Sequence, residues 1–407
     1  MRVGRDLSVP PSTRSSGCPA ALFCQTKRRS SETKSIYRFS RSRQGTSLFY
    51  AIRGHAGSDQ APATARAVHP HASACPHGPL VGTRPILPRH QQRFLMSALR
   101  KSIKEAAVGV HKLCIRMGVH VLPVHYYSPV PNILELKRTK AEWSRPSDLP
   151  GIHVDLDAQL QLLTSVCAPY QFEYKGNPHY REGQDKHFGP GYGPIEAQAL
   201  HGFVRHYKPG RIVEVGSGVS TYCMSKALEL NKREGRPGRI TSVEPYPSAA
   251  LRALPDIELL AQPVQHTDLS VFTSLGEGDL LFIDSSHTVR PGGDVNFLVL
   301  EVLPRLKPGV IVHIHDIYLP YDYQRDTCET FFHWTETSLV RAYMTHNPKV
   351  EILACMSHLH YERAQGMQQV FPDYVPQAND EGLQPEQYSP TSPAPGDFPC
   401  SLYLITK

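Results

Sequence analysis

Between residues 194 and 314 the sequence alternates short apolar runs with helical patterns, and this alternation constrains the fold more than any other feature. Five apolar runs have the length and composition of strands: 211–215, 239–243, 257–261, 279–283 and 310–314. The helical patterns before and between them cover 194–207, 219–231 and 294–306. Strands that alternate with helices form parallel sheets covered on both faces, and such strands are apolar along their length. The sequence therefore predicts an α/β fold with a doubly wound, mostly parallel sheet.

The C-terminal part of the chain adds two strands that are separated by a long insert. Apolar runs at 350–355 and 401–405 follow a helical pattern at 337–343, and the insert 356–400 is rich in Pro, Gln and Asp. Inserts of this length without structure are uncommon unless they are functional or disordered. We therefore expect it either to shape a binding pocket or to be a disordered loop, and we place the whole α/β domain at 186–407.

Residues 1–95 do not have the pattern of a domain. They carry 15 Lys and Arg but only three acidic residues, a net charge of +12, which leaves −5 for the rest of a chain whose total is +7. The segment is rich in Arg, Ser, Pro and His and has no sustained apolar period, so it cannot bury enough surface to offset its ordering entropy, and we expect a disordered basic extension. Its Arg-rich, acid-poor composition is also typical of a mitochondrial transit peptide. The Pro and His residues of 67–90 do not suit such a peptide, and an extension upstream of Met96 is the favoured interpretation.

Residues 96–185 are interpreted as a small N-terminal helical cap. Helical spacing at 97–118 and 156–166 predicts two helices, the first of them basic and amphipathic. No stretch approaches the roughly 18 apolar residues of a membrane span. The nine cysteines are scattered, with no CxxC pair, so we expect reduced thiols in a cytoplasmic protein. Because the part outside 1–95 is mildly acidic, we expect no nucleic-acid partner.

The strongest local signal is the text VEVGSGVST at 213–221, in which a strand runs through two glycines into a helix. Gly216 permits a tight turn, and Gly218 lets the backbone approach a ligand closely. The N–H groups of the helix N-terminus, with the hydroxyls of Ser220 and Thr221, favour an anionic group there. Glu244 is the first residue after the next strand, where a carboxylate can accept both hydroxyls of a ribose.

Two departures distinguish this text from the nicotinamide-binding pattern G-x-G-x-x-G. Thr221 occupies the place of the third glycine, and the acidic Glu214 precedes the first by two residues. In both respects the sequence resembles the class I S-adenosylmethionine-dependent methyltransferases. It is most similar to a bacterial group with the text FIDSSH after strand four, here 282–287, and HxHDI after strand five, here 313–317.

The resemblance implies S-adenosylmethionine as cofactor and a seven-stranded sheet that ends in an antiparallel pair, supplied by 350–355 and 401–405. It further implies that Glu214 helps to orient the methionyl part and that Glu244 binds the ribose. Asp268, after strand three, would lie near the adenine.

Polar residues at the tips of strands four and five are the candidate catalytic group: Asp284, His287 and Asp316. A methyltransferase must position its acceptor and remove a proton from it, and His287 is the candidate base. Asp284 and Asp316 are the alternative, as ligands of Mg²⁺, because their positions resemble those of catechol-type O-methyltransferases. That metal site adds an Asn after the second Asp, where this chain has Ile317.

Two more histidines lie beside this group. We expect His313 to be packed in the core, and His315 remains open between packing and the site. The chain lacks the Asn/Asp-Pro-Pro-aromatic text of enzymes that methylate adenine or amide nitrogens, so we expect O-methylation of a small molecule or a glycan-like hydroxyl. The alternatives are a NAD-dependent oxidoreductase on the same sheet and a non-catalytic nucleotide-binding scaffold.

Overall fold

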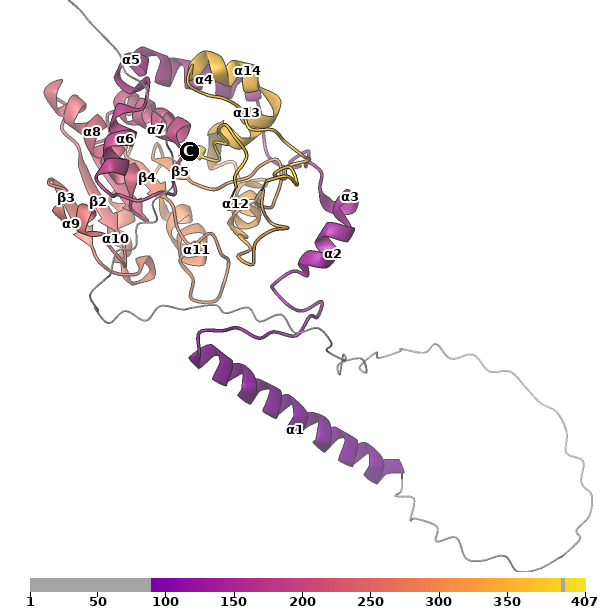
Figure 1. Cartoon of the computed structure of the whole chain (residues 1–407). Helices are drawn as coiled ribbons and strands as arrows, with labels where there is room; N and C mark the ends of the chain where they lie inside the picture. The colour runs from indigo at the N-terminus through magenta and orange to yellow at the C-terminus, as the bar shows by residue number, and fades with distance from the viewer. Residues whose placement is uncertain (1–88, 389–391) are drawn as a thin grey trace, which may run out of the picture. The chain divides into compact units, whose positions relative to one another are not determined.

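The computed structural model describes residues 89–388 and 392–407 (Figure 1). The chain divides into two compact units, one before and one after the boundary between Pro123 and Val124. In the first unit the helix α1 (Arg89–Arg116) contains the predicted basic amphipathic helix and extends it toward the N-terminus. The rest of the expected basic extension, with its transit-peptide alternative, lies outside the described residues.

The second unit is built on one seven-stranded sheet whose order is β3-β2-β1-β4-β5-β7-β6. The strands are β1 (Arg211–Val215), β2 (Arg239–Val243), β3 (Ile257–Leu260), β4 (Leu280–Ile283), β5 (Ile311–Ile314), β6 (Val350–Cys355) and β7 (Leu402–Thr406). The first five are parallel to one another, while β7 is antiparallel to both β5 and β6. The predicted doubly wound sheet, with its antiparallel pair at one edge, is confirmed.

Helices cover both faces of this sheet because successive strand residues point to opposite sides. In β1, Ile212 packs in a core with α7 (Pro194–Tyr207) and α8 (Val219–Arg233), while Val213 packs in a second core on the other face. That second core includes side chains of α10 (Leu269–Thr273), α11 (Asp294–Phe297) and α12 (Glu336–Met344). The predicted helix 294–306 is α-helical only in its first turn. It continues as a π turn, Leu298–Val302, and a 3₁₀ turn, Leu303–Arg305.

The segment that was interpreted as a cap is divided between the two units. Residues 124–185 belong to the same unit as the sheet, where α4 (Leu156–Cys167) packs on α7 and β6, and α6 (Pro178–Asp185) packs on α8. The remaining helices are α2 (Ile133–Arg138), α3 (Lys140–Trp143), α5 (Gln171–Tyr174), α9 (Ala249–Ala253), α13 (Met356–Glu362) and α14 (Ala364–Val370). The last two lie in the insert 356–400, so the start of this insert is helical.

Across the residues that the structure describes, no helix combines the length and apolar character that crossing a membrane requires.

The packing of α4 on α7 depends on Gly202, and a substitution there tests it. A Cβ at Gly202 would lie 2.6 Å from Cys167 Sγ and 2.9 Å from Cys167 Cα, which is too close for any real contact. Alanine gains about 1 kcal/mol of helix propensity, but overpacking of this kind costs up to about 3 kcal/mol, so we expect Gly202→Ala to lower the free energy of unfolding by about 1–2 kcal/mol. Chemical denaturation measures it. Gly276→Ala is the control, because nothing lies within 4 Å of its Cβ; equal stability of the two variants would contradict the packing.

Candidate active site

The crevice where strand order reverses lies between β1 and β4, and the loops after these strands touch there. Gly216 follows β1 with a positive φ of 77°. A Cβ at this position would lie 1.8 Å from the carbonyl oxygen of Asp284, the residue after β4. No side chain fits in that space, so glycine is required by the close approach as well as by the backbone conformation. In doubly wound sheets, ligands bind at such a switch point.

Glu214, on β1, supports the glycine loop (residues 216–218) from the protein interior. Its side chain is fully buried and accepts hydrogen bonds from Ser220 Oγ at 2.9 Å, Thr221 Oγ1 at 2.7 Å and Ser242 Oγ at 3.1 Å. Burial raises the pKa of Glu214 to about 7, although the three hydroxyls oppose the shift. The hydroxyls of Ser220 and Thr221 therefore point inward to Glu214. Their hydrogen bonds hold the glycine loop in place.

Glu244 lies at the end of β2, beside the same loop. Its Oε2 accepts from the backbone N–H of Ser217 at 3.3 Å, and its Oε1 accepts from that of Tyr246 at 2.7 Å. Each oxygen keeps a second lone pair for a ligand hydroxyl. Asp268 lies beyond β3, two strands away from the glycine loop, where its exposed carboxylate caps α10 by accepting from Ser270 N at 2.8 Å.

The loops after β4 and β5 bring together four side chains, which we call the carboxylate–histidine cluster: Asp284, His287, His315 and Asp316. His287 Nε2 lies 3.3 Å from Asp284 Oδ1 and 3.3 Å from Asp316 Oδ2. His315 Nδ1 lies 3.4 Å from each of the same two oxygens. The structure thus brings the three candidate catalytic residues together and adds His315, whose role the sequence left open.

The backbone at this cluster is held in a rarely used conformation. His287 and Asp316 have φ values of 57° and 58°, in the left-handed region that non-glycine residues seldom adopt. The carbonyl of His287 accepts hydrogen bonds from the backbone of Thr335 and Glu336, at 2.8 and 3.1 Å, which hold its loop in place. Such strained residues concentrate at functional sites.

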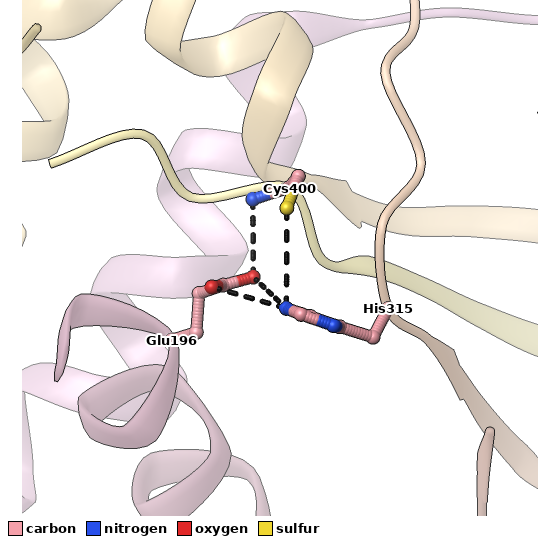
Figure 2. A group of neighbouring side chains, drawn as sticks. All are labelled: Glu196, His315 and Cys400. Atoms are coloured by element: carbon pink, nitrogen blue, oxygen red, sulfur yellow. Dashed lines mark hydrogen bonds and ion pairs between the residues drawn. The ribbon is translucent and has the colours of Figure 1, made fainter. Parts of the chain in front are cut away.

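Each histidine of the cluster has a buried glutamate behind it. His287 Nδ1 lies 2.9 Å from Glu336 Oε2, and His315 Nε2 lies 3.2 Å from both oxygens of Glu196. Figure 2 shows Glu196, on α7, and Cys400 approaching the same ring nitrogen of His315, with Glu196 at the left of the view and Cys400 above. The two glutamates are 1% and 3% exposed. Sequence reasoning missed both, since Glu196 only looked like an acid in the first turn of a helix and Glu336 belongs to no motif.

The carboxylates control the charge of the histidines. Burial by itself lowers the pKa of His287, but Asp284, Glu336 and Asp316 outweigh this and raise it to about 10. The pKa of His315 is also raised, because the nearby carboxylates outweigh its burial. Both Asp284 and Asp316 have lowered pKa values, because the two histidines outweigh the effect of burial. As the side chains stand, the raised pKa keeps the His287 imidazole protonated at neutral pH.

The cluster is open on one side only. The Asp284 side chain is 25% exposed, whereas those of Asp316, His287 and His315 are 13%, 8% and 4% exposed. The second oxygen of Asp316 is turned away from the opening, where it accepts from Tyr318 Oη at 3.0 Å. A ligand that reaches the cluster therefore meets Asp284 first.

His313 lies on the opposite face of β5 and is packed in the core, as expected. It is fully buried, stacks on Phe282 with the ring centres 4.2 Å apart, and its Nε2 lies 2.9 Å from Ser401 Oγ. Burial lowers its pKa, so it is neutral.

Comparison with known proteins gives the family. A family model described as "Methyltransferase domain" matches residues 213–317, from β1 to just beyond β5. An uncharacterized protein of Archaeoglobus fulgidus is 34% identical over 165 residues, which cover 38% of this chain and 73% of that relative.

Solved structures of low similarity include two methyltransferases. A putative methyltransferase from Thermobifida fusca is 14% identical, with 66% of this chain and 97% of that chain covered and a TM-score of 0.24. The 1,6-didemethyltoxoflavin-N1-methyltransferase of Burkholderia thailandensis, with bound 1,6-didemethyltoxoflavin and S-adenosylhomocysteine, is 14% identical, with 64% and 93% covered and a TM-score of 0.26. Scores this low carry no argument about function. The chain belongs to the same family as the archaeal protein, and the family model together with the sheet order shows that it carries a class I methyltransferase domain.

Proposed function

We propose that this protein is an S-adenosylmethionine-dependent O-methyltransferase that acts on a hydroxyl of a small molecule or a glycan-like acceptor. The observation that carries the proposal is the contact between Gly216 and the carbonyl of Asp284. This contact brings the glycine loop next to the carboxylate–histidine cluster in one crevice. The loop suits a cofactor, and the cluster suits a polar acceptor. A group transfer needs its donor and its acceptor side by side in this way.

The residues around the glycine loop fit the cofactor. The loop leaves no room for a side chain at Gly216, and at Gly218 a Cβ would lie only 3.2 Å from the carbonyl oxygen of Phe188. Glu244 has the free lone pairs to accept the two ribose hydroxyls, and Glu214 acts on the methionyl end through the loop that it supports. Asp268 is the candidate for the adenine end. When bound, S-adenosylmethionine supplies a methyl group that is already activated by a sulfonium.

The carboxylate–histidine cluster supports an oxygen acceptor. A hydroxyl becomes nucleophilic when its proton is removed or its charge is stabilised. The sequence left two roles open at this cluster, a free base or a metal site. The surroundings of His287 do not suit a free base, because a raised pKa of about 10 keeps the imidazole protonated. It can act as a base only where a positive charge offsets Asp284 and Asp316.

The rival cofactor is NAD. The dinucleotide pattern uses its third glycine for close packing of the helix on the strand. Here Thr221 is buried at that position, and its hydroxyl donates to Glu214 and accepts from Gly218 N at 3.1 Å. The Thr221 side chain thus holds the glycine loop in place, where the dinucleotide pattern has a glycine. This difference favours S-adenosylmethionine over a dinucleotide.

Calorimetric titration of the full-length protein tests the cofactor site. We expect S-adenosylmethionine and S-adenosylhomocysteine to bind and NAD not to bind. Hydrogen bonds to a charged group contribute about 1.5–3 kcal/mol, so Glu244→Ala should weaken binding roughly 10- to 100-fold. Glu258→Ala is the matched control, because this exposed carboxylate on β3 accepts from Thr241 Oγ1 instead. Preference for NAD would restore the oxidoreductase, and a folded protein that binds neither ligand would restore the scaffold.

Methyl transfer to a panel of catechols, sugars and amines, followed with a radiolabelled methyl group, tests the acceptor site. We expect Asp284→Asn to lower kcat by about 100-fold or more, the scale of a lost acid–base or charge contribution, while the affinity for S-adenosylhomocysteine is unchanged. Asp322→Asn makes the same change on an exposed residue of the loop after β5 and should keep full activity. Equal activity of the two variants, or transfer to amines but not to hydroxyls, would rule out the proposed acceptor chemistry.

A further inference from the structure

In the carboxylate–histidine cluster, both histidines face the same two carboxylate oxygens. His287 Nε2 and His315 Nδ1 lie 3.3 and 3.4 Å from the same two oxygens, Asp284 Oδ1 and Asp316 Oδ2. A charge-assisted hydrogen bond between nitrogen and carboxylate is shorter, about 2.7–2.9 Å. Among the described residues, His315 Nδ1 has no hydrogen-bond partner at all, although the side chain is 4% exposed. A buried imidazole nitrogen is thus directed between two carboxylates and bonded to neither.

The nitrogen–oxygen distances in this cluster are those expected between neighbouring ligands of a tetrahedral metal ion. Zinc binds imidazole nitrogen and carboxylate oxygen at about 2.0–2.2 Å, and tetrahedral geometry then places neighbouring ligand atoms about 3.3–3.6 Å apart. The four nitrogen–oxygen distances of 3.3, 3.3, 3.4 and 3.4 Å fall in this range. Octahedral Mg²⁺ at about 2.0–2.1 Å needs ligand atoms about 3.0 Å apart and prefers oxygen to imidazole. The cluster suits zinc and similar transition metals better than magnesium.

The second nitrogen of each histidine is also engaged as metal sites require. Histidine ligands usually donate their other ring N–H to a carboxylate, which fixes the tautomer and the ring orientation. His287 Nδ1 is paired with Glu336, and His315 Nε2 is paired with Glu196. The remaining ring nitrogens, His287 Nε2 and His315 Nδ1, therefore face the same two carboxylate oxygens and are the atoms that would bind a metal once deprotonated. Each histidine thus has a buried glutamate that fixes the orientation of its ring, as the histidine ligands of metal sites usually do.

The neighbouring trio of Glu196, His315 and Cys400 (Figure 2) is a supporting layer and a poorer metal site. Glu196 Oε1 already accepts from Cys400 N at 3.0 Å and from Ser401 Oγ at 2.7 Å. The Cys400 thiol donates to Asp316 Oδ1 at 3.1 Å and lies 3.9 Å from His315 Nε2. These contacts orient His315 and Asp316 toward the cluster.

We propose that Asp284, His287, His315 and Asp316 bind one divalent transition-metal ion of the zinc type, with Glu336 and Glu196 orienting the two histidines. The metal site stands on its own geometry, and its part in catalysis rests on the proposed function. Because Asp284 is the most exposed of the four, the ion is approachable on that side. Its charge there favours an acceptor that offers an oxygen atom.

The metal content of the full-length protein tests the site without any methyl donor or acceptor. We expect about one zinc-type ion per chain by elemental analysis, and an intense visible absorption of the Co²⁺-loaded protein from tetrahedral coordination. Asp284→Asn and His315→Gln should lower Zn²⁺ affinity by at least 100-fold, and Glu336→Gln by about 10- to 100-fold, as for other residues that orient metal ligands. Asp284 is the least buried ligand, so its variant remains informative if the His315 variant does not fold.

Two exposed residues provide matched controls, since Asp322→Asn and His266→Gln should leave the metal content and the affinity unchanged. The proposal is overturned if the folded protein binds no Zn²⁺ or Co²⁺, or if the bound ion is kept equally well by the Asp284, His315 and Glu336 variants. Failure of the proposed function looks different: the ion would be present and lost in these variants, while S-adenosylhomocysteine does not bind.

Discussion

The contact of the Gly216 backbone with the carbonyl of Asp284 is the constraint on which the rest of this site depends. It occurs where β1 and β4 run side by side, and two hydrogen bonds hold it: Asp284 N to Val215 O at 2.8 Å and Gly216 N to Val243 O at 3.1 Å. Together they lock the ends of three adjacent strands. Because any larger residue at Gly216 would push the two loops apart, the cofactor loop and the carboxylate–histidine cluster exist as one site only with glycine there.

The carboxylate–histidine cluster lowers the stability of the folded protein compared with a cluster of packed apolar side chains. Buried ionised groups are expensive unless they are paired, and a buried ion pair contributes little net stability compared with packed apolar side chains. Here two carboxylates and two histidines lie at the ends of strands whose interior residues are apolar, with two more carboxylates behind them. The left-handed backbone at His287 and Asp316 adds to the cost. Such an arrangement is expected where buried charges bind a metal ion or stabilise a reacting oxygen.

Much of the sheet could be predicted because each strand and helix carries its own pattern. The bounds of β1, β2, β6 and α7 agree with the predicted ranges, since buried parallel strands are apolar throughout and Pro194 marks the start of a helix. The helix at 294–306 differs, because its α-helical turn gives way to π and 3₁₀ turns that no periodicity reveals. The short helices at 124–185 were assigned to a cap, since nothing local in them indicates that they pack on the sheet.

The sequence by itself determined the sheet, the glycine loop with Glu244, and the candidates Asp284, His287 and Asp316, because these follow strands whose ends must meet at one edge. Only the tertiary structure decided that His315 joins them and that Glu196 and Glu336 lie behind the histidines. Glu196 precedes His315 by more than a hundred residues, and Glu336 begins a helix after β5. Their contacts arise from the way helices pack against strand ends, and no local pattern in the chain records that packing.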